Sequence, residues 1–198
     1  MTPSLFNRTN FRAGDILHTA TTSILSRTIM RVLGSVGSHD ALVMAGGIGV
    51  GESVPLRARI TPWADYEKNM LAGKVRVSVL RCPYISGLDG AEITWIWKRD
   101  IEGTPYDFGA FPRLFLKSIF GDICEKAAGW EWANWCTEGI RHAYITGTGN
   151  MCDPWGKTNP TPRTTEKAML DGFFMDVTDE CLTAEGQKYR LDLSGVKK

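Results

Sequence analysis

The chain has 198 residues, a length that fits one domain and is sufficient to bury a substantial core. Hydrophobic residues make up 43% and charged residues 23%, which are ordinary proportions for a globular protein in water. The formal net charge of +1 gives no reason to expect a nucleic acid or an acidic lipid surface as a partner. No apolar stretch approaches the roughly 20 residues that span a bilayer, so no transmembrane segment is expected.

The cysteines indicate neither a disulfide framework nor a metal site. Their count is odd, and no pair has the C-x-x-C spacing of a zinc or redox motif. The histidines share no ligand spacing with them either, so no metal and no cofactor is expected. We predict that most of the thiols are reduced, because the chain is too long to need disulfides for stability. The cysteines are Cys82, Cys124, Cys136, Cys152 and Cys181.

The first residues, Met1–Arg12, lack a basic start followed by an apolar run, so no signal peptide is predicted and synthesis in the cytoplasm is expected.

The first half of the chain alternates short strands with helices. Apolar spacing predicts a helix over Thr22–Leu33. A second helix is predicted over Trp63–Ala72, because a capping hydroxyl at Thr61 and a proline precede it and Gly73 follows it. Strand patterns cover Gly14–His18, His39–Met44, Ile48–Ser53 and Lys74–Leu80, with Val54–Ile60 continuing as extended chain.

The second half contains fewer strand patterns. The spacing from Asp89 to Glu92 is that of a capping box and predicts a helix to Ile101. Further predicted elements are an apolar helix at Phe111–Phe120, a helix from Cys136 to about Tyr144, a long loop at Gly147–Thr165, a short helix at Thr165–Leu170 and a final strand at Lys188–Leu193.

Cys136 is the first candidate for chemistry. It follows a tryptophan-rich stretch, 130–135, and begins a predicted helix. The unpaired N–H groups of a first helical turn favour negative charge, and a thiolate is the nucleophilic form of cysteine. The alternative is that Cys136 is a small buried side chain without a chemical role, as many free cysteines are.

A cysteine nucleophile needs a base and a third group that orients the base. His142 lies six residues after Cys136 on the same predicted helix, a rotation of about 600° that points the two side chains in different directions. His18 remains a candidate. His39 begins a strand, and Glu52 lies on the next strand after a glycine-rich turn, where antiparallel neighbours come into contact. The alternatives are a histidine that only begins a strand and a solvated carboxylate.

A series of short motifs in order along the chain resembles a known family. They are Gly14-Asp15-Ile16, Ser38-His39-Asp40-Ala41-Leu42-Val43, Gly51-Glu52-Ser53, Tyr106-Asp107-Phe108 and Trp135-Cys136-Thr137-Glu138. This order resembles the circularly permuted branch of the NlpC-type papain-like cysteine hydrolases, which includes YiiX-like proteins and relatives of lecithin retinol acyltransferase. The resemblance covers about residues 14–145. It implies an α+β papain-like fold in which a central antiparallel sheet packs against helices, as a single domain over residues 1–198 with a long loop at about 147–165.

Carried over by position, the resemblance makes Cys136 the nucleophile, His39 the general base and Glu52 the residue that orients the base. It places Tyr106 and Trp135 near the substrate or the oxyanion. This chain departs from the family pattern at Thr137, where a serine is usual, and at Asp40, where an apolar residue is usual. The second departure leaves open whether Asp40 or Glu52 orients His39.

The activity implied by the resemblance is thiol-dependent cleavage of an amide or ester, most directly an amide of a peptidoglycan stem peptide. Such a substrate lies outside the cytoplasm, so delivery by a bacteriophage particle or a secretion system is expected. The alternatives are an acyl hydrolase or acyltransferase acting on lipids or small amides, and a non-catalytic phage or assembly module that binds through the same fold. A catalytic site requires Cys136 and His39 within hydrogen-bond reach of each other, whereas a binding module does not.

Overall fold

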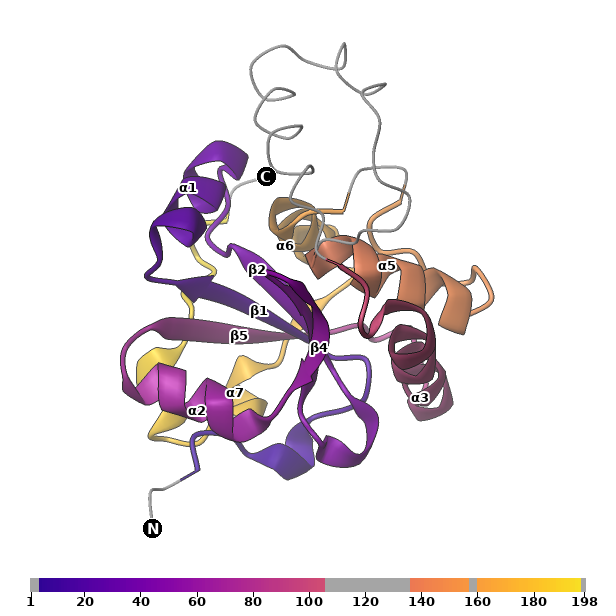
Figure 1. The fold of residues 1–198 in the computed structure, drawn as a ribbon, viewed down its shortest axis with the longest axis horizontal. Helices are drawn as coiled ribbons and strands as arrows, with labels where there is room; N and C mark the ends of the chain where they lie inside the picture. Colours follow the sequence, from indigo (N-terminus) through magenta and orange to yellow (C-terminus); the bar gives the residue numbers. More distant parts are fainter. Residues whose placement is uncertain (1–3, 106–135, 157–159, 197–198) are drawn as a thin grey trace.

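A six-stranded antiparallel sheet forms the centre of an α+β fold, which confirms the predicted fold class (Figure 1). The computed structural model describes residues 4–105, 136–156 and 160–196. The strand order is β4-β3-β2-β1-β5-β6. The strands are β1 (Ile16–Thr21), β2 (His39–Val43), β3 (Val50–Val54), β4 (Arg57–Thr61), β5 (Val75–Arg81) and β6 (Met175–Asp176).

Helices cover both faces of the sheet, with α2 and α7 on one side and α3 and α5 on the other (Figure 1). The helices are α1 (Ile24–Leu33), α2 (Trp63–Leu71), α3 (Gly87–Ile96), α5 (Cys136–Gly147), α6 (Pro162–Leu170) and α7 (Thr178–Cys181). Shorter helical turns are η1 (Arg8–Asn10), η2 (Ala45–Gly47), η3 (Trp97–Ile101) and η5 (Gly186–Tyr189). Among the helices of the described ranges, none combines the length and apolar character that a bilayer span requires.

Alternation along the strands divides the core into two layers. On β2, Leu42 packs in the cluster that contains Ile140 of α5, whereas its neighbour Ala41 packs in the cluster that contains Met70 of α2. This follows from the two-residue period of a strand, which sends successive side chains to opposite faces. The face of the sheet that a polar side chain occupies is therefore fixed by its position in the strand.

Helix α1 lies at one end of the sheet and buries little of its surface. The Ser23 hydroxyl caps its first turn by accepting from the Ser26 N–H at 3.1 Å, and Gly34 ends it in the left-handed conformation at φ 62°. The only buried residue of the helix is Ser26, while Ile24 and Leu25 are 77% and 48% exposed. The helix therefore presents apolar side chains beside the sheet without covering it.

Two predicted segments in the first half of the chain differ from the structure. Residues 54–60 do not continue as one extended segment, because β3 and β4 form a hairpin whose turn holds Leu56 at φ 93°. Helix α3 begins at Gly87, earlier than expected, because Ser86 and Asp89 form its capping box in place of Asp89 and Glu92. The helix continues through the π-helical turn η3 to Ile101, where it was expected to end.

The predicted final strand at residues 188–193 is wrong. Residues 186–189 form the turn η5, and Arg190 makes a single bridge to Val77 of β5. The outer position beside β5 is held instead by β6, which pairs with Leu80 and Arg81. The predicted helix at 165–170 is confirmed as α6, and the apolar segment 111–120 lies outside the described residues.

Candidate active site

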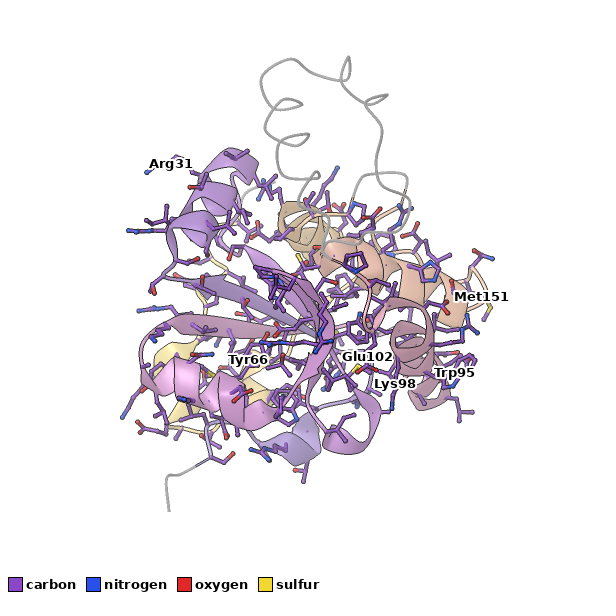
Figure 2. All side chains as sticks on the ribbon, viewed as in Figure 1. Arg31, Tyr66, Trp95, Lys98, Glu102 and Met151 are labelled. Carbon is purple, nitrogen blue, oxygen red and sulfur yellow. The ribbon has the colours of Figure 1, made fainter. Side chains whose placement is uncertain are left out.

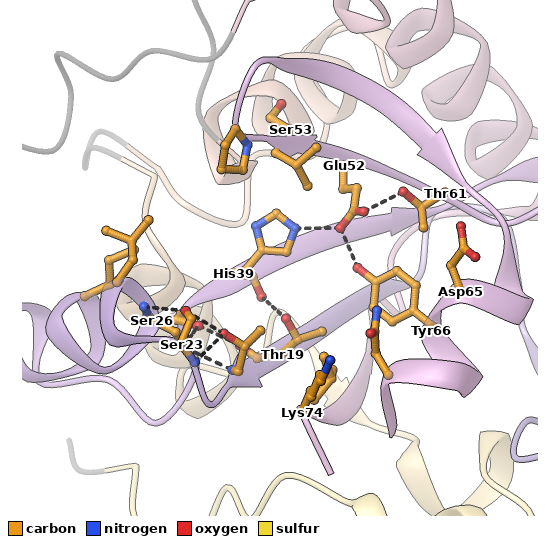
Figure 3. Close-up of a pocket in the computed structure, with 18 of the residues that line it drawn as sticks. Thr19, Ser23, Ser26, His39, Glu52, Ser53, Thr61, Asp65, Tyr66 and Lys74 are labelled. Carbon is orange, nitrogen blue, oxygen red and sulfur yellow. Dashed lines mark hydrogen bonds and ion pairs between the residues drawn. The ribbon is translucent and has the colours of Figure 1, made fainter. Parts of the chain in front are cut away.

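His39 and Glu52 form a hydrogen-bonded pair on the face of the sheet that α2 covers (Figure 3). Because Leu42 pairs with Gly51 in the β2–β3 register, His39 and Glu52 lie diagonally across the two strands with side chains on the same face. His39 Nε2 lies 2.9 Å from Glu52 Oε2, and their side chains are 19% and 7% exposed. The pair is thus mostly shielded from water but open at the imidazole.

Two further side chains fix the Glu52 carboxylate. The Thr61 hydroxyl donates to Oε1 at 2.5 Å, and the Tyr66 hydroxyl of α2 donates to Oε2 at 2.6 Å. Burial alone would raise the pKa of Glu52, but the hydrogen bonds from His39, Thr61 and Tyr66 lower it to about 2. Glu52 is therefore an anion that accepts three hydrogen bonds in one orientation.

The expected capping role of Thr61 is wrong. The residue that precedes α2 is Pro62, no side chain caps this helix end, and the Thr61 hydroxyl is directed at Glu52 instead. The Thr61 hydroxyl donates to a charged carboxylate, and hydrogen bonds to ionised groups are stronger than those between neutral groups.

Cys136 is the first residue of α5 and is 6% exposed, and it lies close enough to His39 to act on the imidazole. Burial would lower the pKa of His39, but the charge and hydrogen bond of Cys136, followed by those of Glu52, raise it well above 6.5. Since Nε2 is bonded to Glu52, Nδ1 is the ring nitrogen left for the sulfur. The structure thus brings together Cys136, His39 and Glu52, the three residues that the sequence grouped.

Asp40 does not orient His39, because it points to the opposite face of the sheet. Its Oδ2 accepts from the Thr137 hydroxyl of α5 and the Thr165 hydroxyl of α6, both at 2.8 Å, and its Oδ1 lies 2.6 Å from His18 Nδ1. The two-residue period of β2 separates the neighbours His39 and Asp40. The question that the sequence left open is answered geometrically: Glu52 is the carboxylate bonded to His39.

His18 lies in a second network, which is fully buried. Its Nε2 is 3.2 Å from Glu166 Oε1, and the same oxygen accepts the backbone N–H groups of Val36 at 2.7 Å and Gly37 at 3.0 Å. Burial would lower the pKa of His18, but the Asp40 charge and hydrogen bond and those of Glu166 raise it to about 9. Both ring nitrogens of His18 are engaged by carboxylates, so His18 is unsuited to act as the base.

The remaining predicted residues lie apart from this site or outside the described chain. His142 is exposed on α5 and lies 3.0 Å from Asp100, in agreement with its rejection as the base. Tyr106 and Trp135 fall outside the described residues. Sequence reasoning missed Tyr66, because its spacing from Trp63 and Met70 is that of a core-facing helix stripe.

A cavity of about 550 Å³ opens beside the imidazole, between α1, α2 and the sheet (Figure 3). Hydroxyl groups, apolar side chains and charged side chains line it, so it can hold a ligand of mixed character. The lining residues include Thr19, Thr21, Leu25, Ile29, His39, Glu52, Val54, Arg59, Asp65, Tyr66, Lys68 and Lys74.

Comparisons with known proteins give the fold but no family. No model of a known protein family matches the chain, and no curated protein sequence matches it. A solved structure that matches is the metalloprotein YiiX of Escherichia coli O157:H7, DUF1105, with a TM-score of 0.58. The sequences are 19% identical, and the match covers 84% of this chain and 96% of the YiiX chain. The chain therefore has a YiiX-like fold.

YiiX is described as a metalloprotein, so the metal donors of this chain are relevant. Within the described ranges, no group of three or more His, Cys, Asp or Glu side chains is placed to hold a metal ion. The ring nitrogens of His18 are both hydrogen-bonded to carboxylates, and Cys82 and Cys152 face each other with their sulfurs 3.6 Å apart. These donor groups do not fit a metal centre.

Proposed function

We propose that the chain is a thiol hydrolase in which Cys136 is the nucleophile, His39 the general base and Glu52 the residue that orients His39. The observation that carries the proposal is the position of His39 between Glu52, to which it is hydrogen-bonded at 2.9 Å, and Cys136, which acts on its imidazole. We also propose that residues 1–198 form one domain of the permuted NlpC type, in which the segment around 147–165 is a specificity element.

The proposed reaction is acyl transfer to water. His39 takes the proton of the Cys136 thiol, and the sulfur attacks the carbonyl carbon of the substrate. His39 then protonates the leaving amine as the carbon–nitrogen bond breaks, and a thioester remains. Water attacks the thioester, giving its proton to His39, and the carboxylic acid product leaves as the thiol is restored. Free N–H groups in the first turn of α5 would stabilise the oxyanion.

The substrate class that we propose is an amide of a peptidoglycan stem peptide. The support is the YiiX-like fold together with the motif order, and a cavity of about 550 Å³ that His39 lines. Tyr106 and Trp135 are proposed to contact this substrate. Delivery would come from a phage particle or a secretion system.

A digestion of purified sacculi tests this proposal. We expect the protein to release new amino groups, and the Cys136→Ala variant to release none above background. The matched control is Cys181→Ala, which removes a buried thiol beside Arg81, away from His39. Equal release by the wild-type protein and Cys136→Ala would contradict the assignment of the nucleophile.

Acyl lipids are the second candidate substrates. The specific observation is that Leu25 and Ile29 of the poorly covered helix α1 line the cavity, where an acyl chain could contact them. Incubation of the wild-type protein and Cys136→Ala with acyl lipids distinguishes the two candidate substrates. Release of fatty acid by the wild-type protein, without release of amino groups from sacculi, would favour the lipid. A protein inactive on both, with an unreactive Cys136, would favour a binding module.

A further inference from the structure

We infer that the substrate carries a negatively charged group, which binds at the part of the cavity formed by β4, α2 and the start of β5. This inference rests on the proposed thiol hydrolase and extends it to the charge of the substrate. It follows from three cationic side chains that line the cavity containing His39: Arg59, Lys68 and Lys74.

The three cations come from three different elements. Arg59 lies on β4, Lys68 lies in the last turn of α2, and Lys74 immediately precedes β5. All three side chains belong to exposed residues. Elsewhere in the fold, Arg81 and Arg141 are paired with carboxylates at 2.7 Å. The three cavity cations have no ion-pair partner within the described residues, so their charge is available to a ligand.

The acidic groups of the cavity do not cancel this charge. Glu52 is already hydrogen-bonded to His39, Thr61 and Tyr66, and its negative charge is offset by an imidazole whose pKa is raised well above 6.5. Asp65, in the first turn of α2, is the other acidic residue of the lining. Three positive groups therefore face one uncommitted carboxylate, and the potential in the cavity favours an anion.

The opposite wall has a different character and gives the substrate a direction. Leu25 and Ile29 of α1 line it. An uncharged or apolar part of the substrate would lie there, while its anionic part faces α2. His39 lines the same cavity, so the reacting carbonyl would lie beside its imidazole.

Alkylation of Cys136 tests the inference without knowledge of the natural substrate. Iodoacetate carries one negative charge and iodoacetamide carries none, while their size and reacting carbon are similar. The measurement is the ratio of their rates at Cys136, with the modified cysteine mapped by mass spectrometry. It is made on the full chain for the wild-type protein, for K68E/K74E and for Lys98→Glu. Lys98 is the matched control, because it lies on η3, on the side of the molecule away from α1 (Figure 2).

We expect the iodoacetate to iodoacetamide ratio to fall about tenfold in K68E/K74E at low ionic strength, and the difference to shrink as salt is added. The iodoacetamide rate should stay unchanged, which shows that the variant is folded and its cysteine still activated. In Lys98→Glu the ratio should equal that of the wild-type protein. The neutral variant K68M/K74M should give an intermediate ratio.

An unchanged ratio in K68E/K74E, with rapid labelling of Cys136, would overturn the inference and leave the proposed thiol hydrolase intact. Slow labelling of wild-type Cys136 by both reagents, unaffected by His39→Ala, would instead overturn the proposed function, and the inference with it. The two failures are therefore distinguishable in one experiment.

Discussion

Two histidine–carboxylate networks lie on opposite faces of the same sheet, built from the same chemical groups. His39 and Glu52 border a cavity, and the His39 side chain is 19% exposed. His18, Asp40 and Glu166 are completely shielded from water. The neighbouring positions 39 and 40 of β2 divide between the two networks, because successive strand residues face opposite ways.

The difference between the networks lies in the ring nitrogens. One nitrogen of His39 is held by a carboxylate, and the other is left for the thiol of Cys136, which acts on the imidazole. Both nitrogens of His18 are held by carboxylates, which also accept hydroxyl groups of α5 and α6 and backbone N–H groups of the segment before β2. A histidine can exchange protons with a substrate only from a nitrogen that can reach it. The first network is therefore suited to catalysis, and the second to holding together the elements that carry Cys136.

The largest expected effect comes from His39→Ala. Loss of a general base lowers activity by about 10²–10⁴-fold. We expect the alkylation rate of Cys136 near neutral pH to fall by about 30-fold, because a cysteine without a base to take its proton is only a few per cent thiolate there. Iodoacetamide labelling across pH, mapped by mass spectrometry, measures this change. The control is the exposed histidine variant His142→Ala, which should react like the wild-type protein. A wild-type rate in His39→Ala would mean that the two networks do not differ in the way we propose.

The second prediction concerns the pH dependence of stability and belongs to the buried network. The pKa of His18 is raised to about 9 in the folded chain from 6.5, so its contribution is fully present below about pH 6.5 and is lost as the pH rises through about 9. We expect the free energy of unfolding to fall over that window by on the order of 3 kcal/mol because of this group.

Urea unfolding of wild-type protein and His18→Gln, measured between pH 6 and pH 9.5, isolates this contribution. The variant should lose the part of the slope that belongs to His18, whereas His142→Gln should keep the wild-type slope, because His142 is exposed. Identical slopes in the wild-type protein and His18→Gln would show that His18 is not charged in the folded state.

The grouping of Cys136, His39 and Glu52 could be predicted from the sequence, because each of the three residues has a local signal. Cys136 begins a helix, His39 begins a strand, and Glu52 lies on the next strand of a glycine-linked hairpin. The order of these motifs along the chain supplied the grouping. Strand alternation could also have answered which carboxylate serves His39, since Asp40 is its direct neighbour and must face away.

The second network could not be predicted, because its contacts join residues far apart in the chain. Glu166 meets His18 across 148 positions, and Thr165 meets Asp40 across 125. In the sequence, Glu166 lies in a short polar helix and reads as a surface residue, yet it is completely buried. Burial of such a group depends on partners that only the tertiary structure assembles.

The third prediction tests how tightly the buried network is packed. A Cβ atom added at Gly37 would lie 2.1 Å from His18 Nε2, and the His18 side chain has no exposed surface into which to move. We expect Gly37→Ala to destabilise the fold by about 1–3 kcal/mol, the usual cost of overpacking a core.

Gly87→Ala is the matched control for this substitution. Gly87 begins α3, and a Cβ there would meet nothing within 4 Å, so the variant should be at least as stable as the wild-type protein. Urea unfolding midpoints measure both. Equal stability of Gly37→Ala and the wild-type protein would show that the region around His18 can relax, and the contrast between a sealed and an open network would weaken.

The smallest effect is expected from Tyr66→Phe, which changes only the support of the open network. The variant loses the hydroxyl that donates to Glu52 at 2.6 Å but keeps the buried ring. With two of its three side-chain donors left, Glu52 should have a pKa above about 2. The ionised Glu52 stabilises the fold above its ordinary pKa, and on acidification the variant should lose this stability at a higher pH than the wild-type protein does. We expect the Cys136 alkylation rate to fall about fivefold, in line with one hydrogen bond of about 1 kcal/mol.

Tyr84→Phe is the control, since Tyr84 is 68% exposed and its hydroxyl donates to Gly172 instead. If Tyr66→Phe reacted like Tyr84→Phe at every pH, the position of the Glu52 carboxylate would not depend on α2, and His39 would be oriented by β3 and β4 alone.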